Sequence, residues 1–199
     1  MTKTREMMDE REYLKKCQVT IFMVLVNVAL FIICEFLGGS EDTGVLIRMG
    51  ASVTERILDG EYYRLVTCMF LHIGIAHLIN NMIVLIALGE YIEPVTGHVR
   101  YLILYLIGGT AGSILSVLCD IAENDTGTVS AGASGAVFAL IGAYVVMVIR
   151  KRIRNQRLSL ARLAFGIGLA ILPGFYTPGV GVTAHLGGLI AGGVMGLFF

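Results

Sequence analysis

The chain has 199 residues, of which 56% are hydrophobic and 15% are charged, and its mean hydropathy is +0.79. That much apolar sequence excludes an ordinary soluble domain. The formal net charge is zero, so the balance of charges gives no reason to expect a nucleic-acid partner.

Six apolar runs follow one another along the chain, and runs of about 18 or more apolar residues indicate membrane helices. The runs are Gln18–Leu37, Thr67–Gly89, Val99–Cys119, Ala131–Ile149, Leu158–Pro173 and Val180–Phe199. The fifth run has the weakest pattern, because it contains Arg162 and several glycines. The sequence therefore predicts an all-α membrane protein, a compact bundle of six transmembrane helices. Residues 1–17 are expected to form a cytoplasmic N-terminal segment, and residues 18–199 a single membrane domain.

Lysine and arginine in the short connections predict the orientation of such a bundle, because these residues gather on the cytoplasmic side. The N-terminal segment carries Lys3, Arg5, Arg11, Lys15 and Lys16, and the connection between the fourth and fifth runs carries Arg150, Lys151, Arg152, Arg154 and Arg157. The connection between the third and fourth runs instead holds three acids and no base. Both termini are therefore expected in the cytoplasm, with the residue 90–98 connection also inside.

The first external connection, residues 38–66, mixes apolar and charged residues. Such a segment is expected to lie in the membrane interface as short amphipathic helices. The four cysteines have no metal-ligand spacing and occur in or near apolar runs, so we expect them to pack as small hydrophobic residues instead of forming disulfides.

Polar side chains inside the apolar runs are few, and buried ionisable groups in membrane segments are usually functional. His72, His77 and Asn81 fall in the second run, Ser134 in the fourth and His185 in the sixth. Given the predicted orientation and a rise of about 1.5 Å per helical residue, these groups share the outer half of the membrane. His77 and Asn81 are four residues apart and share a helix face, whereas His72 is expected to point away from it.

Glycines predict which helices pack closely. His185 continues a stripe of small residues that lets the sixth helix approach a neighbour through its backbone, namely Gly188, Gly192 and Gly196. If that neighbour is the fourth helix, whose own glycines include Gly132 and Gly135, Ser134 and His185 come into contact. Ordinary packing remains an alternative for each feature alone: a buried serine bonded to a carbonyl, a structural histidine, and a glycine stripe that only packs.

Three motifs together resemble the signature of the rhomboid intramembrane serine proteases. They are Gly132-Ala133-Ser134-Gly135, His72-x4-His77-x3-Asn81 and Ala184-His185-x-x-Gly188-x-x-x-Gly192. The resemblance extends to Tyr63-Arg64 and to Gly89-x-x-x-Glu93. The chain departs from it at Tyr63, where the family often has tryptophan, and at Phe138, where some members have tyrosine. These two departures affect the expected substrate preference more than the expected activity.

The resemblance implies that Ser134 is the nucleophile and His185 its general base. No acid follows Asp125 in the sequence, so the arrangement is a dyad without a third carboxylate on the later helices. The Ser134 N–H, Asn81 and His77 are the implied oxyanion donors, and His72 is implied to help hold water. Arg64 and Glu93 are expected to be structural, Arg64 within the external connection and Glu93 at the inner end of the second helix. Phe138 is expected to stack on His185.

No cofactor or metal is implied. The expected partners are the lipid bilayer and single-span membrane-protein substrates, cut near the outer surface. The expected location is a prokaryotic plasma membrane, with the active site opening outward.

Two rival functions use the same residues. A family member could bind transmembrane segments without cutting them, but such relatives are expected to lack the serine or the histidine. A transporter or metal carrier could use the histidines, but the sequence shows neither an internal repeat nor an acid at mid-membrane depth.

Overall fold

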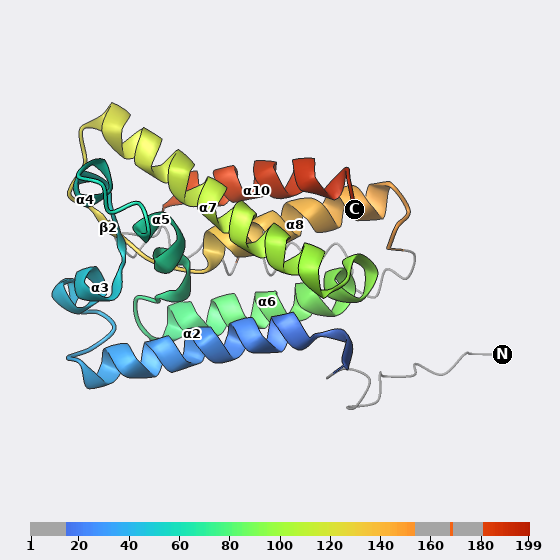
Figure 1. Cartoon of the computed structure of the whole chain (residues 1–199), viewed down its shortest axis with the longest axis horizontal. Coiled ribbons are helices and arrows are strands. Elements are labelled where there is room, and N and C mark those ends of the chain that lie inside the picture. The colour runs from blue at the N-terminus through green and yellow to red at the C-terminus, as the bar shows by residue number, and fades with distance from the viewer. Residues whose placement is uncertain (1–14, 154–167, 169–180) are drawn as a thin grey trace.

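The computed structural model describes residues 15–153, 168 and 181–199, and it is dominated by five apolar helices. They are α2 (Gln18–Phe36), α6 (Ile75–Thr96), α7 (His98–Glu123), α8 (Ser134–Ile149) and α10 (Val182–Gly196). Helices α8 and α10 lie side by side, as do α2 and α6, and α7 runs diagonally across the bundle and packs mainly on α8 and α10 (Figure 1). The arrangement is a helical membrane bundle of the predicted class.

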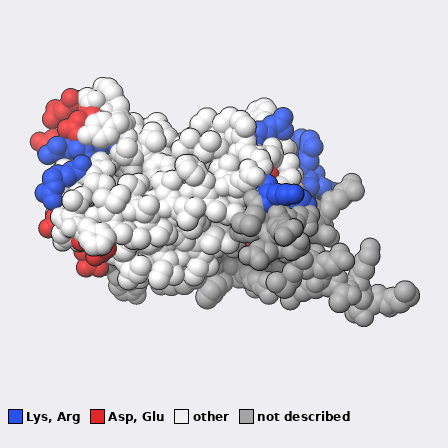
Figure 2. All heavy atoms as spheres, turned by 60° about the horizontal axis from the view of Figure 1, so that its bottom comes forward, with Lys and Arg blue, Asp and Glu red and all other residues white. Residues whose placement is uncertain are grey.

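Three of these helices are long and apolar enough to cross a membrane: α2, α6 and α7, with 19, 22 and 26 residues. Helices α8 and α10 are apolar but shorter. On the face shown in Figure 2, a wide surface without charged side chains separates two ends that carry them. The fifth predicted run, Leu158–Pro173, lies outside the described residues, and the total of six spans therefore stays a prediction.

The second predicted span is wrong at both ends. The sequence indicated Thr67–Gly89, but α6 begins at Ile75, after Gly74 in a left-handed conformation with φ of 77°, and it continues to Thr96. The apolar residues before Gly74 instead belong to a 3₁₀ turn, η1 (Cys68–Phe70), and an extended stretch that are buried against the bundle. The predicted inner connection of residues 90–98 is consequently reduced to a turn at Gly97 between α6 and α7.

Between α2 and α6, the chain forms a folded cap over one end of the bundle. Its elements are α3 (Thr43–Met49), β1 (Ser52–Val53), α4 (Thr54–Leu58), α5 (Arg64–Thr67) and η1. Arg64 is 3% exposed and holds this cap together. Its guanidinium donates to the carbonyls of Ile47 and Ala51, at 2.8 and 2.9 Å, and to the Glu61 carboxylate. Arg64 thus makes its contacts within the cap.

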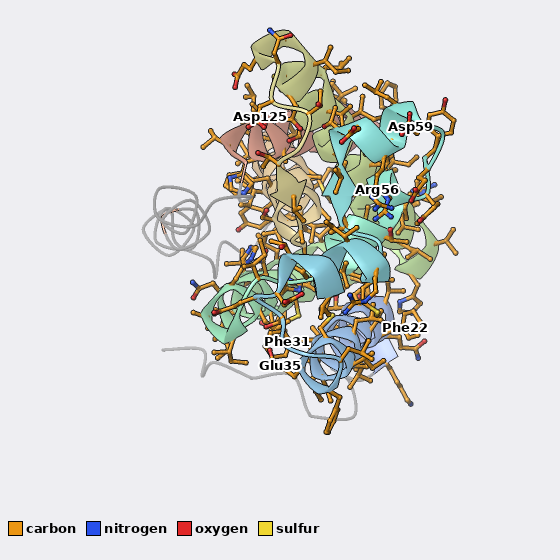
Figure 3. The ribbon with its side chains drawn as sticks, turned by 90° about the vertical axis from the view of Figure 1, so that its left-hand side faces the viewer. Phe22, Phe31, Glu35, Arg56, Asp59 and Asp125 are labelled. Atoms are coloured by element: carbon orange, nitrogen blue, oxygen red, sulfur yellow. The ribbon has the colours of Figure 1, made fainter. Side chains whose placement is uncertain are left out.

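The cap is joined to the segment that precedes α8. Strand β1 pairs antiparallel with β2 (Val129–Ser130), which the all-helical expectation did not include. The N–H of Glu55 donates to the carbonyl of Thr126, and the Thr54 hydroxyl donates to Asp120 at 2.7 Å. Figure 3 looks onto this end and shows Glu35, Arg56, Asp59 and Asp125 spread across it. The cap therefore holds the strand that leads to Ser134.

Helices α8 and α10 meet through their backbones. A Cβ atom added at Gly188 would overlap the Gly135 carbonyl, and one at Gly192 would overlap the Ala139 carbonyl. The same holds in the other direction, where a Cβ at Gly142 would overlap the Leu189 carbonyl. This close approach is what the glycine stripe predicted, with α8 as the neighbour of α10.

At the opposite end of the bundle, Glu93 of α6 caps the start of α2. One carboxylate oxygen accepts the N–H of Val19 and the other that of Thr20, both at 2.8 Å, and the Thr20 hydroxyl donates at 2.6 Å. The first N–H groups of a helix lack partners within it, and Cys17 at the N-cap of α2 supplies none. His98 also contacts this fully buried carboxylate, at 2.6 Å. Glu93 therefore joins α2, α6 and α7.

Candidate active site

Ser134 is the first residue of α8, at the end of the bundle covered by the cap. The preceding loop is held from two sides: the Gly132 N–H donates to the Cys68 carbonyl at 3.0 Å, and the Ala133 N–H donates to His72 Nε2 at 3.4 Å. Since Ser134 begins a helix, its own N–H has no partner within that helix. A hydroxyl and a backbone donor without an intrahelical acceptor thus meet at one residue.

His185 lies in the first turn of α10 and is 3% exposed. Its ring is stacked on Phe138, with ring centroids 4.4 Å apart and planes 9° apart. Phe138 is one helical turn after Ser134, so this stacking brings the imidazole alongside the first turn of α8.

Backbone contact supports the same placement. A Cβ at Gly135 would lie 3.6 Å from the Ala184 carbonyl oxygen, so the residue after Ser134 meets the residue before His185. Within the described part of the chain, both ring nitrogens of His185 are buried without a hydrogen-bond partner, and no hydrogen bond joins His185 to Ser134. Catalytic hydrogen bonds are often long before substrate binds.

His77 and Ser134 face the same small space. A Cβ at Gly132 would lie 2.9 Å from His77 Nε2 and 3.7 Å from Ser134 Oγ, so both atoms border the space beside this glycine. Gly132 has a φ of 148°, which side-chain-bearing residues rarely adopt. A hydrogen in place of a side chain at Gly132 leaves that space open between the hydroxyl and the imidazole.

Asn81 lies one turn further along α6 and is buried. Its Nδ2 donates one hydrogen bond to the His77 carbonyl at 2.9 Å, and an amide nitrogen has a second N–H to give. The described hydrogen bonds of Asn81 do not include Ser134, so the structure brings Asn81 to His77 but not directly to Ser134.

The prediction that His72 points away from His77 on a shared helix is wrong. His72 lies before α6, in the extended stretch, and its ring is edge-on to His77 with centroids 5.3 Å apart. Because His72 Nε2 accepts the Ala133 N–H, the ring braces the loop that precedes Ser134.

A cavity of about 30 Å³ opens next to Ser134, large enough for roughly two water molecules. Besides Ser134, its polar lining comes from Ser113 and Ser116 of α7, from Cys68 of η1, and from the paired strand residues Ser52 and Ser130. The Cys68 thiol lies 3.3 Å from the Ser113 hydroxyl. Sequence reasoning missed these residues, although Gly108, Gly109, Gly112, Ser113 and Ser116 form a small-residue pattern on the third apolar run that marks a face in close contact.

No metal-binding group was found in the described ranges: no three His, Cys, Asp or Glu side chains there come together in a way that could hold an ion.

Comparison with protein-family models matches residues 59–199 to the Rhomboid domain. Among curated proteins, the chain is 34% identical over 177 residues to "Rhomboid protease GluP" of Bacillus subtilis (strain 168). The aligned region covers 87% of this chain and 33% of that protein. It is 38% identical over 153 residues to "RHOMBOID-like protein 5" of Arabidopsis thaliana, covering 76% of this chain and 48% of that protein. The chain thus spans about a third to a half of the length of these relatives. The matched residues contain the site and all of α6, α7, α8 and α10, and this chain belongs to the rhomboid family.

Proposed function

We propose that this chain is an intramembrane serine endopeptidase that cuts membrane-protein substrates near the outer-leaflet end of their transmembrane segments. The observation that carries the proposal is the position of the His185 ring, stacked one turn from Ser134 where α8 and α10 touch through their backbones. A serine beside an imidazole in a buried, water-accessible pocket can perform acyl transfer.

In the proposed reaction, His185 takes the proton from the Ser134 hydroxyl as the oxygen attacks the scissile carbonyl. His185 then gives this proton to the leaving amine. A water molecule, activated by His185, hydrolyses the acyl-enzyme and restores Ser134. Stacking on Phe138 orients the imidazole, since the sequence contains no acid after Asp125 that could do so from α8 or α10.

The proposed oxyanion donors are the Ser134 N–H, the free N–H of Asn81 and His77. Ser134 is the first residue of α8, so its N–H points out of the helix. The Asn81 Nδ2 donates only one of its two hydrogens, to the His77 carbonyl, among the described residues. Both observations support the assignment of these groups as donors. His77 Nε2 borders the space beside Ser134 Oγ. Removal of one such donor typically lowers turnover by about 10²–10³-fold, much less than removal of the nucleophile.

We infer that the hydrolytic water occupies the cavity bordered by Cys68, Ser113 and Ser116. The sequence suggested His72 for this role, but its bond to the Ala133 N–H supports a structural one. The proposed substrates are single-span proteins whose helices unwind at the cut. The proposed setting is a prokaryotic plasma membrane with both termini in the cytoplasm, as the distribution of Lys and Arg favours.

Labelling with a fluorophosphonate probe tests the proposal most directly. We expect the purified chain in liposomes to be labelled at Ser134 and to cleave a single-span model substrate, and Ser134→Ala to abolish both. Ser40→Ala is the matched control, because Ser40 is a buried serine of the cap whose N–H bonds Glu35, away from the site. Labelling that persists in Ser134→Ala would place the reactive group elsewhere.

The alternative of a non-proteolytic binder gives a different result in the same experiment. A binder would retain a transmembrane peptide on a column without labelling or cleavage by the parent chain. The carrier alternative predicts an effect of chelators, whereas cleavage by the proposed dyad should be unchanged by EDTA.

A further inference from the structure

Basic side chains gather at the end of the bundle opposite Ser134. Helix α8 runs from Ser134 to that end, where Arg150, Lys151 and Arg152 follow it. Arg100 lies in the first turn of the neighbouring helix α7, and Lys15 and Lys16 precede α2. All six side chains are exposed, and blue side chains mark this end in Figure 2.

The two ends of the bundle differ in how their cations are neutralised. In the cap, two of the three arginines, Arg64 and Arg56, pair with Glu61, at 2.6 and 3.4 Å, and no described carboxylate lies within 4.0 Å of Arg48. At the basic end, no carboxylate in the described part of the chain lies within 4.0 Å of Arg100, Lys151 or Arg152. The Glu93 carboxylate is buried there and its oxygens are occupied by α2 and His98. These three cations therefore form no ion pair with the described groups, and the remaining carboxylate at this end, Glu90, is exposed on α6.

The turn that carries Lys151 and Arg152 is fixed. The Lys151 N–H donates to the Val148 carbonyl at 3.0 Å and the Arg152 N–H to the Met147 carbonyl at 2.9 Å. Ile153 is 6% exposed and belongs to the hydrophobic core. The Arg150 guanidinium donates to the Leu197 carbonyl and so ties the turn to the end of α10. Lys151 and Arg152 are thus presented outward from a rigid backbone.

The position of these cations selects their partner. They lie where the apolar surface of the bundle ends, which is the depth of lipid phosphates in a membrane. The sequence continues with Arg154 and Arg157 and contains no Asp or Glu after Asp125, so the later part of the chain holds no carboxylate to neutralise them. Arginine binds phosphate oxygens in a two-pronged manner, and clusters of Lys and Arg beside membrane helices attract anionic lipids.

We propose that the end of the bundle opposite Ser134 binds anionic phospholipid head groups, with Lys151, Arg152 and Arg100 contacting the phosphate. This site is independent of peptide hydrolysis, and its occupancy ties the inner ends of α7 and α8 to the lipid.

Native mass spectrometry of the full chain in neutral detergent tests this site, with dioleoylphosphatidylglycerol and dioleoylphosphatidylcholine as the probes. We expect phosphatidylglycerol to bind about tenfold more tightly than phosphatidylcholine, and Lys151→Gln/Arg152→Gln to lose most of that preference. The matched control is Arg48→Gln/Arg56→Gln, which removes two exposed arginines from the cap and should keep the preference.

Three results would overturn the proposal. The first is an unchanged phosphatidylglycerol preference in Lys151→Gln/Arg152→Gln, and the second is an equal loss of that preference in the cap control. The third is displacement of bound phosphatidylglycerol by inorganic phosphate at the same concentration, which would assign the cations to a free anion. Because both substitutions are on exposed side chains, the thermal stability of the double variant in phosphatidylcholine should equal that of the parent.

Discussion

His185 and Phe138 lie face to face, with their ring planes 9° apart and their centroids 4.4 Å apart. The two residues are far apart in sequence, and no acidic residue follows Asp125 that could orient the imidazole from α8 or α10. The orientation of the proposed general base therefore depends on a flat apolar surface.

Phe138→Leu tests this dependence, because leucine fills the space without offering a flat face. We expect kcat/KM for a transmembrane substrate to fall by about 10²-fold, the cost of a misplaced catalytic group. Phe138→Tyr keeps the ring and should stay close to the parent. Equal activity in the leucine variant and the parent, measured in liposomes, would show that stacking does not position His185.

Gly132→Ala should remove most of the activity. The new methyl group would lie 2.7 Å from the His77 ring, within the space that His77 and Ser134 share, and φ of 148° would be strained by about 1–3 kcal/mol. Gly127→Ala is the control, because no atom outside its immediate neighbours lies within 4 Å of its added Cβ. Both variants are compared by fluorophosphonate labelling rate and thermal stability. Normal labelling of Gly132→Ala would contradict the close approach.

Glu93→Gln should lower the free energy of unfolding by at least about 1–3 kcal/mol, the cost of one unsatisfied buried donor. The amide supplies one acceptor oxygen where the carboxylate supplies two, and Val19 and Thr20 each need one. Glu90→Gln is the control, since Glu90 is on the same helix and exposed. Unfolding in mixed micelles measures the difference. An equal effect of both substitutions would rule out a special role for the Glu93 cap.

We expect the stability of the cap to depend on pH through Glu61. The Tyr63 hydroxyl and the Arg64 guanidinium donate to its carboxylate, each at 2.7 Å, and lower the pKa of Glu61 below its ordinary value. A lowered pKa means that the stabilisation is fully present above the ordinary value of about 4.3 and is lost as the pH falls through the lower pKa.

Tyr63→Phe removes the larger of these two causes, so the acid-induced opening of the cap should begin at higher pH. Limited proteolysis of residues 43–70 across an acid pH series measures that opening. Tyr62→Phe alters the neighbouring exposed tyrosine and should leave the profile unchanged. A profile for Tyr63→Phe that coincides with the parent's would mean that the tyrosine contact does not stabilise the cap.

The bundle could be predicted from the sequence because membrane helices need long apolar runs. The start of α6 could not, since Cys68, Met69 and Leu71 are as apolar as the helix that follows. Hydropathy does not distinguish a buried loop from a membrane helix, because both kinds of segment consist of apolar residues. Gly74, with its positive φ, marks the true boundary.

The later start of α6 also explains the error over His72. A helical face was assumed for His72, which lies in an extended stretch before α6, so the expectation that it points away from His77 does not apply there. The pairing of α8 with α10 could be predicted, because glycines at four-residue spacing have a direct packing meaning. The partners of Glu93 could not, since nothing in the sequence of α6 indicates that the first turn of α2 lies beside it.

The backbone contact between α8 and α10 has a mechanical consequence. Side chains can rotate out of the way of an incoming segment, but main-chain atoms already in contact cannot. The two helices therefore act as one rigid body that keeps the hydroxyl and the imidazole at a constant separation. In the proposed reaction, a substrate would enter between other helices, where side chains can move aside.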